Sequence, residues 1–165
     1  MKTPVMIRAC QQQDTEQLER QSRPQPVRFQ RQQQGHSTFL IALSVPDGVP
    51  VGMGEILWDG CAAPEVRQRY PSCPELNGLE VWPAELRSHG IGTAIVHTAE
   101  DLARRRGCRQ LGLGVDDHNH GAAALYLRLG YQETGCRYLD RYHYVDDNGV
   151  RHEVADPARF LVKRL

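Results

Sequence analysis

The sequence lacks three features that would place it in a specialised class of protein. No apolar run approaches the roughly 18–20 residues that a membrane-spanning helix needs. No charge of one sign predominates, since 20 basic residues balance 20 acidic ones, and bulk nucleic-acid binding normally needs a basic excess. The N-terminus also turns polar too early for a signal peptide. We therefore expect a cytoplasmic protein that binds neither membranes nor nucleic acids.

Cysteine patterns of the kind that build disulfide frameworks or zinc sites are also missing. The five cysteines are odd in number and form no CxxC pair: Cys10, Cys61, Cys73, Cys108 and Cys136. This usage indicates reduced thiols. The run Asp116-Asp117-His118-Asn119-His120 contains ligand-type residues, but side chains packed so tightly along a chain seldom all point to one ion. We expect no metal site.

The chain does contain enough apolar sequence for one domain with a hydrophobic core, and we assign residues 1–165 to a single domain. Alternating and continuous apolar runs predict seven strands, near residues 5–8, 38–43, 51–58, 76–82, 109–115, from 131 onward, and at 160–162. Helical spacing predicts three helices, one capped by Asp14, one from Ile91 to Gly107, and one from Asn119 to Gly130. This order indicates an α/β (α+β) domain with a mixed sheet.

Two segments have weaker patterns. Residues 21–36 are rich in Gln, Arg and Pro, which is typical of a solvated helix or loop but also fits a flap that borders a substrate cleft. Residues 59–74 contain three prolines and are expected to form a loop with room for one helical turn.

The stretch from Leu79 to Ile95, LEVWPAELRSHGIGTAI, places two glycines at the start of the second helix. A helix N-terminus is an anion site, and glycines remove side chains that would keep a phosphate away. The dinucleotide fingerprint GxGxxG would need a third glycine where Ile95 stands, and no GxxxxGK[ST] run exists. The remaining pattern is Arg-x-x-Gly-x-Gly after a strand that ends in Val-x-Pro.

That pattern, Val81-Trp82-Pro83 followed by Arg87-Ser88-His89-Gly90-Ile91-Gly92-Thr93, resembles motif A of the GNAT superfamily of acyl-CoA-dependent N-acyltransferases. The stretch from Asn119 to Tyr131 fits that family's Asn-x-x-Ala-x-x-Leu-Tyr-x-x-x-Gly-Phe/Tyr sequence. The resemblance covers nearly the whole chain. It implies a single GNAT-like domain, with a mostly antiparallel sheet of six to seven strands flanked by helices and splayed at the cofactor site, and acetyl-CoA as co-substrate.

The resemblance also implies how the chain binds the co-substrate. The pyrophosphate would rest on the motif A loop, and the pantetheine arm would bond the strand backbone beside a β-bulge. The implied binding residues are Val81, Trp82, Arg87, Ser88, His89, Gly90, Ile91, Gly92, Thr93, Asn119 and Ala122. Asn119 also has a purely structural interpretation as the N-cap of its helix.

The implied chemistry is attack of an amine on a thioester, which needs a base, an oxyanion donor and an acid. The Val81 amide is the expected donor and Tyr126 the expected acid, although Tyr126 also fits a core-facing tyrosine. For the base we favour Glu75, with Glu80 or a water molecule as alternatives. Period-two alternation places Glu75, Asn77, Leu79 and Val81 on one strand face and Glu80 on the other, unless a bulge reverses the parity.

We therefore expect an N-acetyltransferase that moves an acetyl group from acetyl-CoA to a primary amine by direct attack in a ternary complex. The acceptor would be a small-molecule or peptide amine whose identity the sequence does not specify. One alternative is a non-catalytic acyl-CoA-binding or regulatory protein that retains the fold. Another is an assembly module, for which the last strands would form a homodimer.

Overall fold

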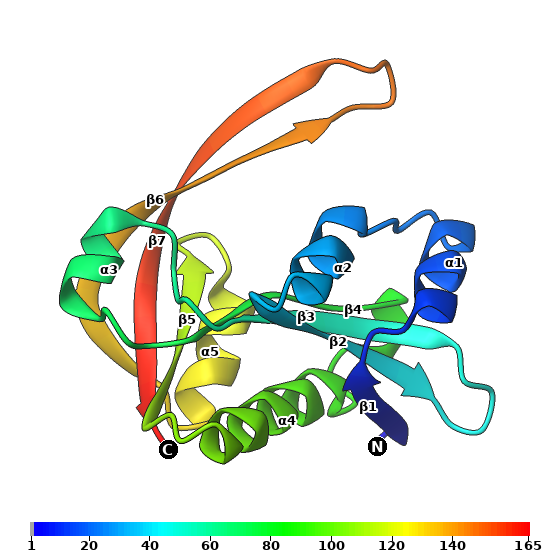
Figure 1. Ribbon diagram of the computed structural model, residues 1–165, viewed down its shortest axis with the longest axis horizontal. Coiled ribbons are helices and arrows are strands. Elements are labelled where there is room, and N and C mark those ends of the chain that lie inside the picture. Colours follow the sequence, from blue (N-terminus) through cyan, green and yellow to red (C-terminus); the bar gives the residue numbers. More distant parts are fainter. Residues whose placement is uncertain (1) are drawn as a thin grey trace.

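The computed structural model describes residues 2–165 and contains one seven-stranded sheet flanked by helices (Figure 1). Across the sheet the strands run β1 (Val5–Ala9), β2 (Ser37–Ser44), β3 (Pro50–Leu57), β4 (Glu75–Val81), β5 (Gln110–Asp116), β7 (Arg151–Arg164) and β6 (Gln132–Val145). Every neighbouring pair is antiparallel except β4 and β5. The sheet is therefore mixed and mostly antiparallel, as the sequence predicts.

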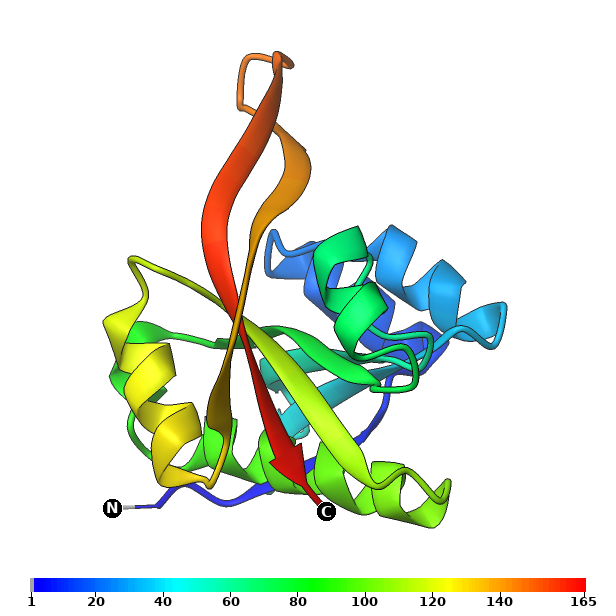
Figure 2. The ribbon, with the colours of Figure 1, turned by 90° about the vertical axis from the view of Figure 1, so that its left-hand side faces the viewer.

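Helices cover both faces of the sheet (Figure 2). On one face lie α4 (Ile91–Arg105) and α5 (His120–Arg128), and on the other lie α1 (Gln12–Arg20), α2 (Pro26–Gln33) and α3 (Pro64–Arg69). A short 3₁₀ turn, η1 (Ala84–Leu86), follows β4. Helices α2 and α3 extend the sequence prediction, which left their segments as helix or loop.

Alternation along the central strands explains the two-sided packing. In β2, Leu40 and Ala42 join the core under α4, whereas Phe39 and Ile41 join the core under α1. Both sets are fully buried because the strand is covered on both faces. This continuous apolar run sets the position of α4 against the centre of the sheet.

The start of α1 differs from its prediction. Its N-cap is Gln11, and Asp14 lies three residues inside, where its carboxylate accepts a hydrogen bond of 2.7 Å from the Gln11 amide. Asp14 is buried and also pairs with Arg8 at 2.5 Å. The Asp14 N-cap assignment was therefore wrong, because this carboxylate fills the reciprocal position of a capping box.

Strands β4 and β5 separate soon after they meet. They pair only through Glu75–Gly112 and Leu76–Leu113, while β5 pairs with β7 over its full length. Opposite β3, the register of β4 shifts near Gly78, which has a positive φ of 65°. A backbone conformation of this kind suits glycine and marks a β-bulge. The bulge turns β4 away from β5 and opens the sheet.

The bulge also reverses the face on which the later side chains of β4 lie. Before it, Leu76 packs in the α4 core; after it, Leu79 and Val81 pack there, while Trp82 packs under α1. The expectation that Glu75 and Asn77 share a face with Leu79 and Val81 was therefore wrong. One extra residue in the strand places Glu75 and Glu80 on the same face.

The last two strands form a long hairpin that projects beyond the rest of the sheet (Figures 1 and 2). They stay paired as far as Val145–Arg151. The sequence identified only residues 160–162 of β7, because its outer half is polar and exposed rather than apolar. Within residues 2–165, no helix has the length and apolar character needed to cross a membrane.

Candidate active site

A cavity of about 780 Å³ occupies the opening between β4, the start of α4 and α5. It brings together most of the binding residues predicted from the sequence. These are Val81, Arg87, Ser88, His89, Gly90, Gly92, Thr93, Asn119 and Ala122, together with the predicted acid Tyr126. The side chains of Ile91 and Trp82 lie in the two apolar cores and do not line this cavity.

The floor of this cavity is the N-terminus of α4. Gly90 caps the helix with a φ of 86°, and no side chain of the described residues caps the first-turn amides. The amides of Ile91, Gly92 and Thr93 have no intrahelical acceptor at this end of a helix. A Cβ on Gly92 would lie 3.8–4.0 Å from Leu125, Leu79 and Val81, so this glycine keeps the opening free beside β4. The arrangement suits an anion with an extended group attached.

Three basic side chains line the same cavity: Lys2, Arg87 and Arg128. Lys2 arrives there because the N-terminal segment is fastened to the loop. The Thr3 amide donates to the His89 carbonyl at 3.0 Å, and the Thr3 hydroxyl lies 2.9 Å from His89 Nδ1. The sequence motifs did not identify Lys2 or Arg128, since no spacing rule links them to the glycine loop. Together with the free amides they make this end of the cavity electropositive.

The backbone of β4 presents one residue to the opening. The Trp82 amide donates to the Val51 carbonyl of β3 at 2.9 Å, so it faces away from β5. Because backbone groups alternate along a strand, the Val81 amide and carbonyl face the opening. The Arg87 Nε donates to the Val81 carbonyl at 3.3 Å, which is consistent with that direction. The Val81 backbone therefore faces the opening, whereas the Trp82 amide faces β3, and the binding roles of both residues stay predictions.

Asn119 and Tyr126 lie on α5 at the inner end of the cavity. The Asn119 Oδ1 accepts from the Ala122 amide at 3.0 Å, so Asn119 does cap its helix, and its Nδ2 remains available to a ligand. Tyr126 is only 6% exposed, and burial raises the pKa of its phenol to about 12. The phenol therefore stays protonated around neutral pH and is suited to donate a proton.

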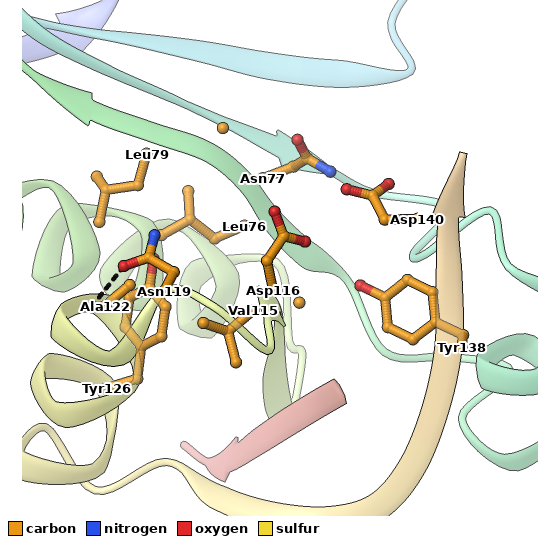
Figure 3. A pocket seen from close by; sticks show the side chains of 12 residues that line it. Leu76, Asn77, Leu79, Val115, Asp116, Asn119, Ala122, Tyr126, Tyr138 and Asp140 are labelled. Atoms are coloured by element: carbon orange, nitrogen blue, oxygen red, sulfur yellow. Dashed lines mark hydrogen bonds between the residues drawn. The ribbon is translucent and has the colours of Figure 1, made fainter. Parts of the chain in front are cut away.

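A smaller cavity of about 220 Å³ continues from this inner end to the opposite face of the sheet (Figure 3). Asn119, Ala122, Tyr126 and Leu79 line both cavities. Figure 3 shows Asn119 and Tyr126 on one side and Tyr138 and Asp140 on the other, with Asp116 between them. The opening in the sheet thus connects a positively charged cavity to an acidic one.

Glu75 lies behind this second cavity. Its side chain is 2% exposed, its Oε1 accepts from Asn77 Nδ2 at 2.9 Å, and its Oε2 has no hydrogen-bond partner in the described chain. Burial is the main cause that raises the pKa of Glu75, and the charges of Asp140 and Glu55 add to it, while the Asn77 hydrogen bond and the neighbouring Cys61 thiol oppose it. A carboxylate with a raised pKa and a free oxygen has the properties of a general base.

Glu80, the alternative base, is engaged elsewhere. Its carboxylate forms an ion pair with Arg23, whose guanidinium stacks 4.4 Å from the Trp82 ring centroid. It contributes to the lining of the positively charged cavity but not to that of the acidic one. Neither carboxylate lines the acidic cavity, but Glu75 has an oxygen without a partner whereas Glu80 is paired with Arg23, so the geometry favours Glu75.

A third cavity, of about 550 Å³, adjoins the acidic one and shares Asn77, Tyr138 and Asp140 with it. Its walls include Glu75 and, from α2, Arg28 and Arg31. These two arginines flank Glu55, at 3.8 and 3.2 Å. Residues 21–36 therefore border a cleft, in agreement with the functional interpretation of that segment.

Comparisons with known proteins agree with this arrangement. The model of the acetyltransferase (GNAT) family matches residues 6–131. The uncharacterized N-acetyltransferase MJ1207 of Methanocaldococcus jannaschii is 43% identical over 59 residues, which are 36% of this chain and 26% of that protein. The matched segment thus spans about a quarter of this relative.

Solved structures show the same fold. Nourseothricin acetyltransferase is 25% identical, with a TM-score of 0.56 over 79% of this chain and 66% of that one. An N-acetyltransferase from Staphylococcus aureus is 18% identical, with a TM-score of 0.68 over 98% and 99% of the two chains. Because the family model covers most of the sequence and the opened sheet carries the family's motifs, the chain belongs to the acetyltransferase (GNAT) family.

Proposed function

We propose that this protein transfers an acetyl group from acetyl-CoA to a primary amine by direct attack in a ternary complex. The observation that carries the proposal is the passage through the sheet at the β4–β5 opening. It connects an electropositive cavity, suited to a phosphorylated carrier, with an acidic cavity suited to an amine. Both substrates can then meet at Asn119 and Tyr126, which line both cavities.

The residues present fit acetyl-CoA, the acetyl donor of this family. The uncapped amides of α4, with Lys2, Arg87 and Arg128, would hold its phosphates. Val81 and Asn119 would bond its extended arm through the backbone and Nδ2. When bound, acetyl-CoA supplies an acetyl group activated as a thioester. The protein's part is to orient that group and to move protons.

Glu75 is the proposed base. An alkylamine is mostly protonated near neutral pH, so it must lose a proton before it can attack. The unpartnered Oε2 of Glu75 would accept that proton from the amine, directly or through a water molecule in the third cavity, which adjoins the acidic one. Asn77 would hold the other oxygen in place.

Val81 and Tyr126 act on the other side of the reaction. The Val81 amide faces the opening and would donate to the oxygen on which negative charge develops. The bond that forms joins nitrogen to the acetyl carbon, and the bond that breaks joins that carbon to sulfur. The Tyr126 phenol, protonated because of its raised pKa, would give its proton to the leaving thiolate, and the second proton that the nitrogen loses as the amide forms would restore the phenol.

An amine library assayed by release of the CoA thiol tests this proposal, with Tyr126→Phe and Glu75→Gln beside the wild type. We expect turnover with at least one amine, and loss of most of it in both variants. Binding of CoA without turnover for any amine, unaffected by Tyr126→Phe, would instead indicate a non-catalytic acyl-CoA-binding protein. Failure to bind CoA would indicate an assembly module. The homodimer through the last strands stays a prediction, which sedimentation velocity can test.

A further inference from the structure

Three aspartates gather on one sheet face beside the proposed reaction centre: Asp116 of β5, Asp140 of β6 and Asp156 of β7. Asp140 lies directly opposite Asp156, and Asp116 lies opposite Ala158, two residues from Asp156 along β7. Residues in these register positions point to the same face. Asp116 and Asp140 line the acidic cavity itself. We name these three residues the carboxylate cluster.

The carboxylate cluster has no cationic partner within residues 2–165. Of the basic residues nearby, Arg137 pairs with Asp117, and Arg28 and Arg31 flank Glu55; Arg141 lines the third cavity but forms no ion pair with the cluster. Its one side-chain hydrogen bond comes from the Tyr142 hydroxyl to Asp156, at 2.9 Å. Burial and the neighbouring carboxylates raise the pKa values of Asp116 and Asp140, and His118 opposes the shift at Asp116. Such a group is costly to retain without a counter-charge.

The third cavity joins Glu75 to the carboxylate cluster, because both Glu75 and Asp140 line it. The Tyr138 hydroxyl fills the space over Gly114, where a Cβ would lie 1.9 Å from that hydroxyl and 3.9 Å from Glu75 Oε2. The buried Glu75 Oε2 therefore lies close to the Tyr138 hydroxyl, in the cavity that Asp140 also lines. Gly114 and Asp116 are two residues apart, about 7 Å along a strand. A ligand with two positively charged nitrogens at that spacing would satisfy both Glu75 and the carboxylate cluster.

We propose that the acceptor is a dication, in which one amine reacts at Glu75 while a second ammonium is held by Asp116, Asp140 and Asp156. This inference rests on the proposed function. It follows from charge balance, because a monoamine must lose its charge to react and would leave the cluster without a counter-ion. A second, non-reacting ammonium keeps its charge and neutralises the cluster throughout the reaction.

Three acceptors of equal chain length test the inference by the charge at their far end: 1,4-diaminobutane, butylamine and 4-aminobutanoate. We expect kcat/KM to fall in that order, with the diamine ahead of the monoamine by about tenfold or more, beyond the factor of two for its two amines. Asp156→Asn should lower the diamine value about tenfold and the butylamine value less than about twofold. Asp47→Asn, in the exposed β2–β3 turn, is the matched control and should change neither.

Other results would overturn the inference without overturning the proposed function. One such result is turnover that does not depend on the charge at the far end of the acceptor. Another is an equal loss for diamine and monoamine in Asp156→Asn. A third is calorimetric binding of Ca²⁺ at the cluster together with an amine preference that Asp156→Asn does not change. Tight binding of CoA with neither turnover nor binding of 1,4-diaminobutane would also refute it. Failure to bind acetyl-CoA at all would refute the proposed function itself.

Discussion

Replacing Glu75 with glutamine should remove activity and stabilise the protein at the same time. The carboxylate is 2% exposed, and one of its oxygens has no partner. Gln keeps the shape and keeps an oxygen that accepts from Asn77. What changes is the charge, and with it the ability to take a proton from an amine.

The sign of the stability effect follows from the raised pKa of Glu75. In the pH range between the ordinary carboxyl pKa and the raised folded-state value, the folded protein binds the proton more tightly than the unfolded chain does. Stability therefore falls as pH rises through that range, and the cost persists above it. Glu75→Gln abolishes this cost. The Gln amide nitrogen would also lack a partner, so the gain is the difference between a charged and a neutral unpaired group, about 1–3 kcal/mol, and about 1 kcal/mol moves Tm by roughly 2–4 °C at this size.

Thermal unfolding at two pH values, combined with the thiol-release assay, measures both effects. Near pH 8 we expect the variant to unfold about 2–10 °C above the wild type, and at about pH 4 the two should nearly coincide. Turnover should fall by about 10²–10⁴-fold, as for loss of a general base. The wild type should also lose kcat/KM as pH falls through the raised pKa of Glu75. A variant less stable than the wild type near pH 8, with turnover retained, would refute the reasoning and make Glu75 a structural residue.

Further predictions concern the co-substrate cavity. Gly92→Ala should stabilise α4 by about 0.5–1 kcal/mol in thermal unfolding. It should also weaken acetyl-CoA binding in calorimetry, because the added Cβ enters the opening. Unchanged affinity would count against acetyl-CoA binding beside Gly92. Tyr126→Phe should lower kcat about 10²-fold or more and leave acetyl-CoA affinity unchanged; equal losses in both would indicate a packing role. Arg128→Met should weaken CoA binding several-fold at low salt and less at high salt, as titrations at two ionic strengths would show; a loss independent of salt would exclude a phosphate contact.

Local chemistry in the sequence was sufficient to predict most of the fold and to name many of the residues that line the electropositive cavity. The glycines at 90 and 92 and the continuous apolar run of β2 determine backbone geometry within a few residues, so motif and structure agree there. The electropositive cavity also contains Lys2 and Arg128, which reach it through the attachment of the N-terminus to His89 and through the orientation of α5. No local pattern encodes such tertiary contacts.

The bulge at Gly78 shows why the acidic side was harder to predict. One residue with positive φ reverses the facing of every later side chain in β4, and a single glycine in a strand does not reveal its φ. The carboxylate cluster depends on the register between β5, β7 and β6, three strands whose pairing order differs from their chain order. The sequence therefore drew attention to Asp116 only as part of a run of ligand-type residues, and it gave no signal for Asp140.

The central claim is that the opening between β4 and β5, with the free amides of α4, binds CoA. Isothermal titration calorimetry of the wild type and Gly92→Ala with CoA tests it most directly. We predict saturable binding with one site per chain in the wild type and clearly weaker binding in the variant, at equal or higher thermal stability. No heat of binding with the wild type, or equal affinity in both proteins, would contradict the account.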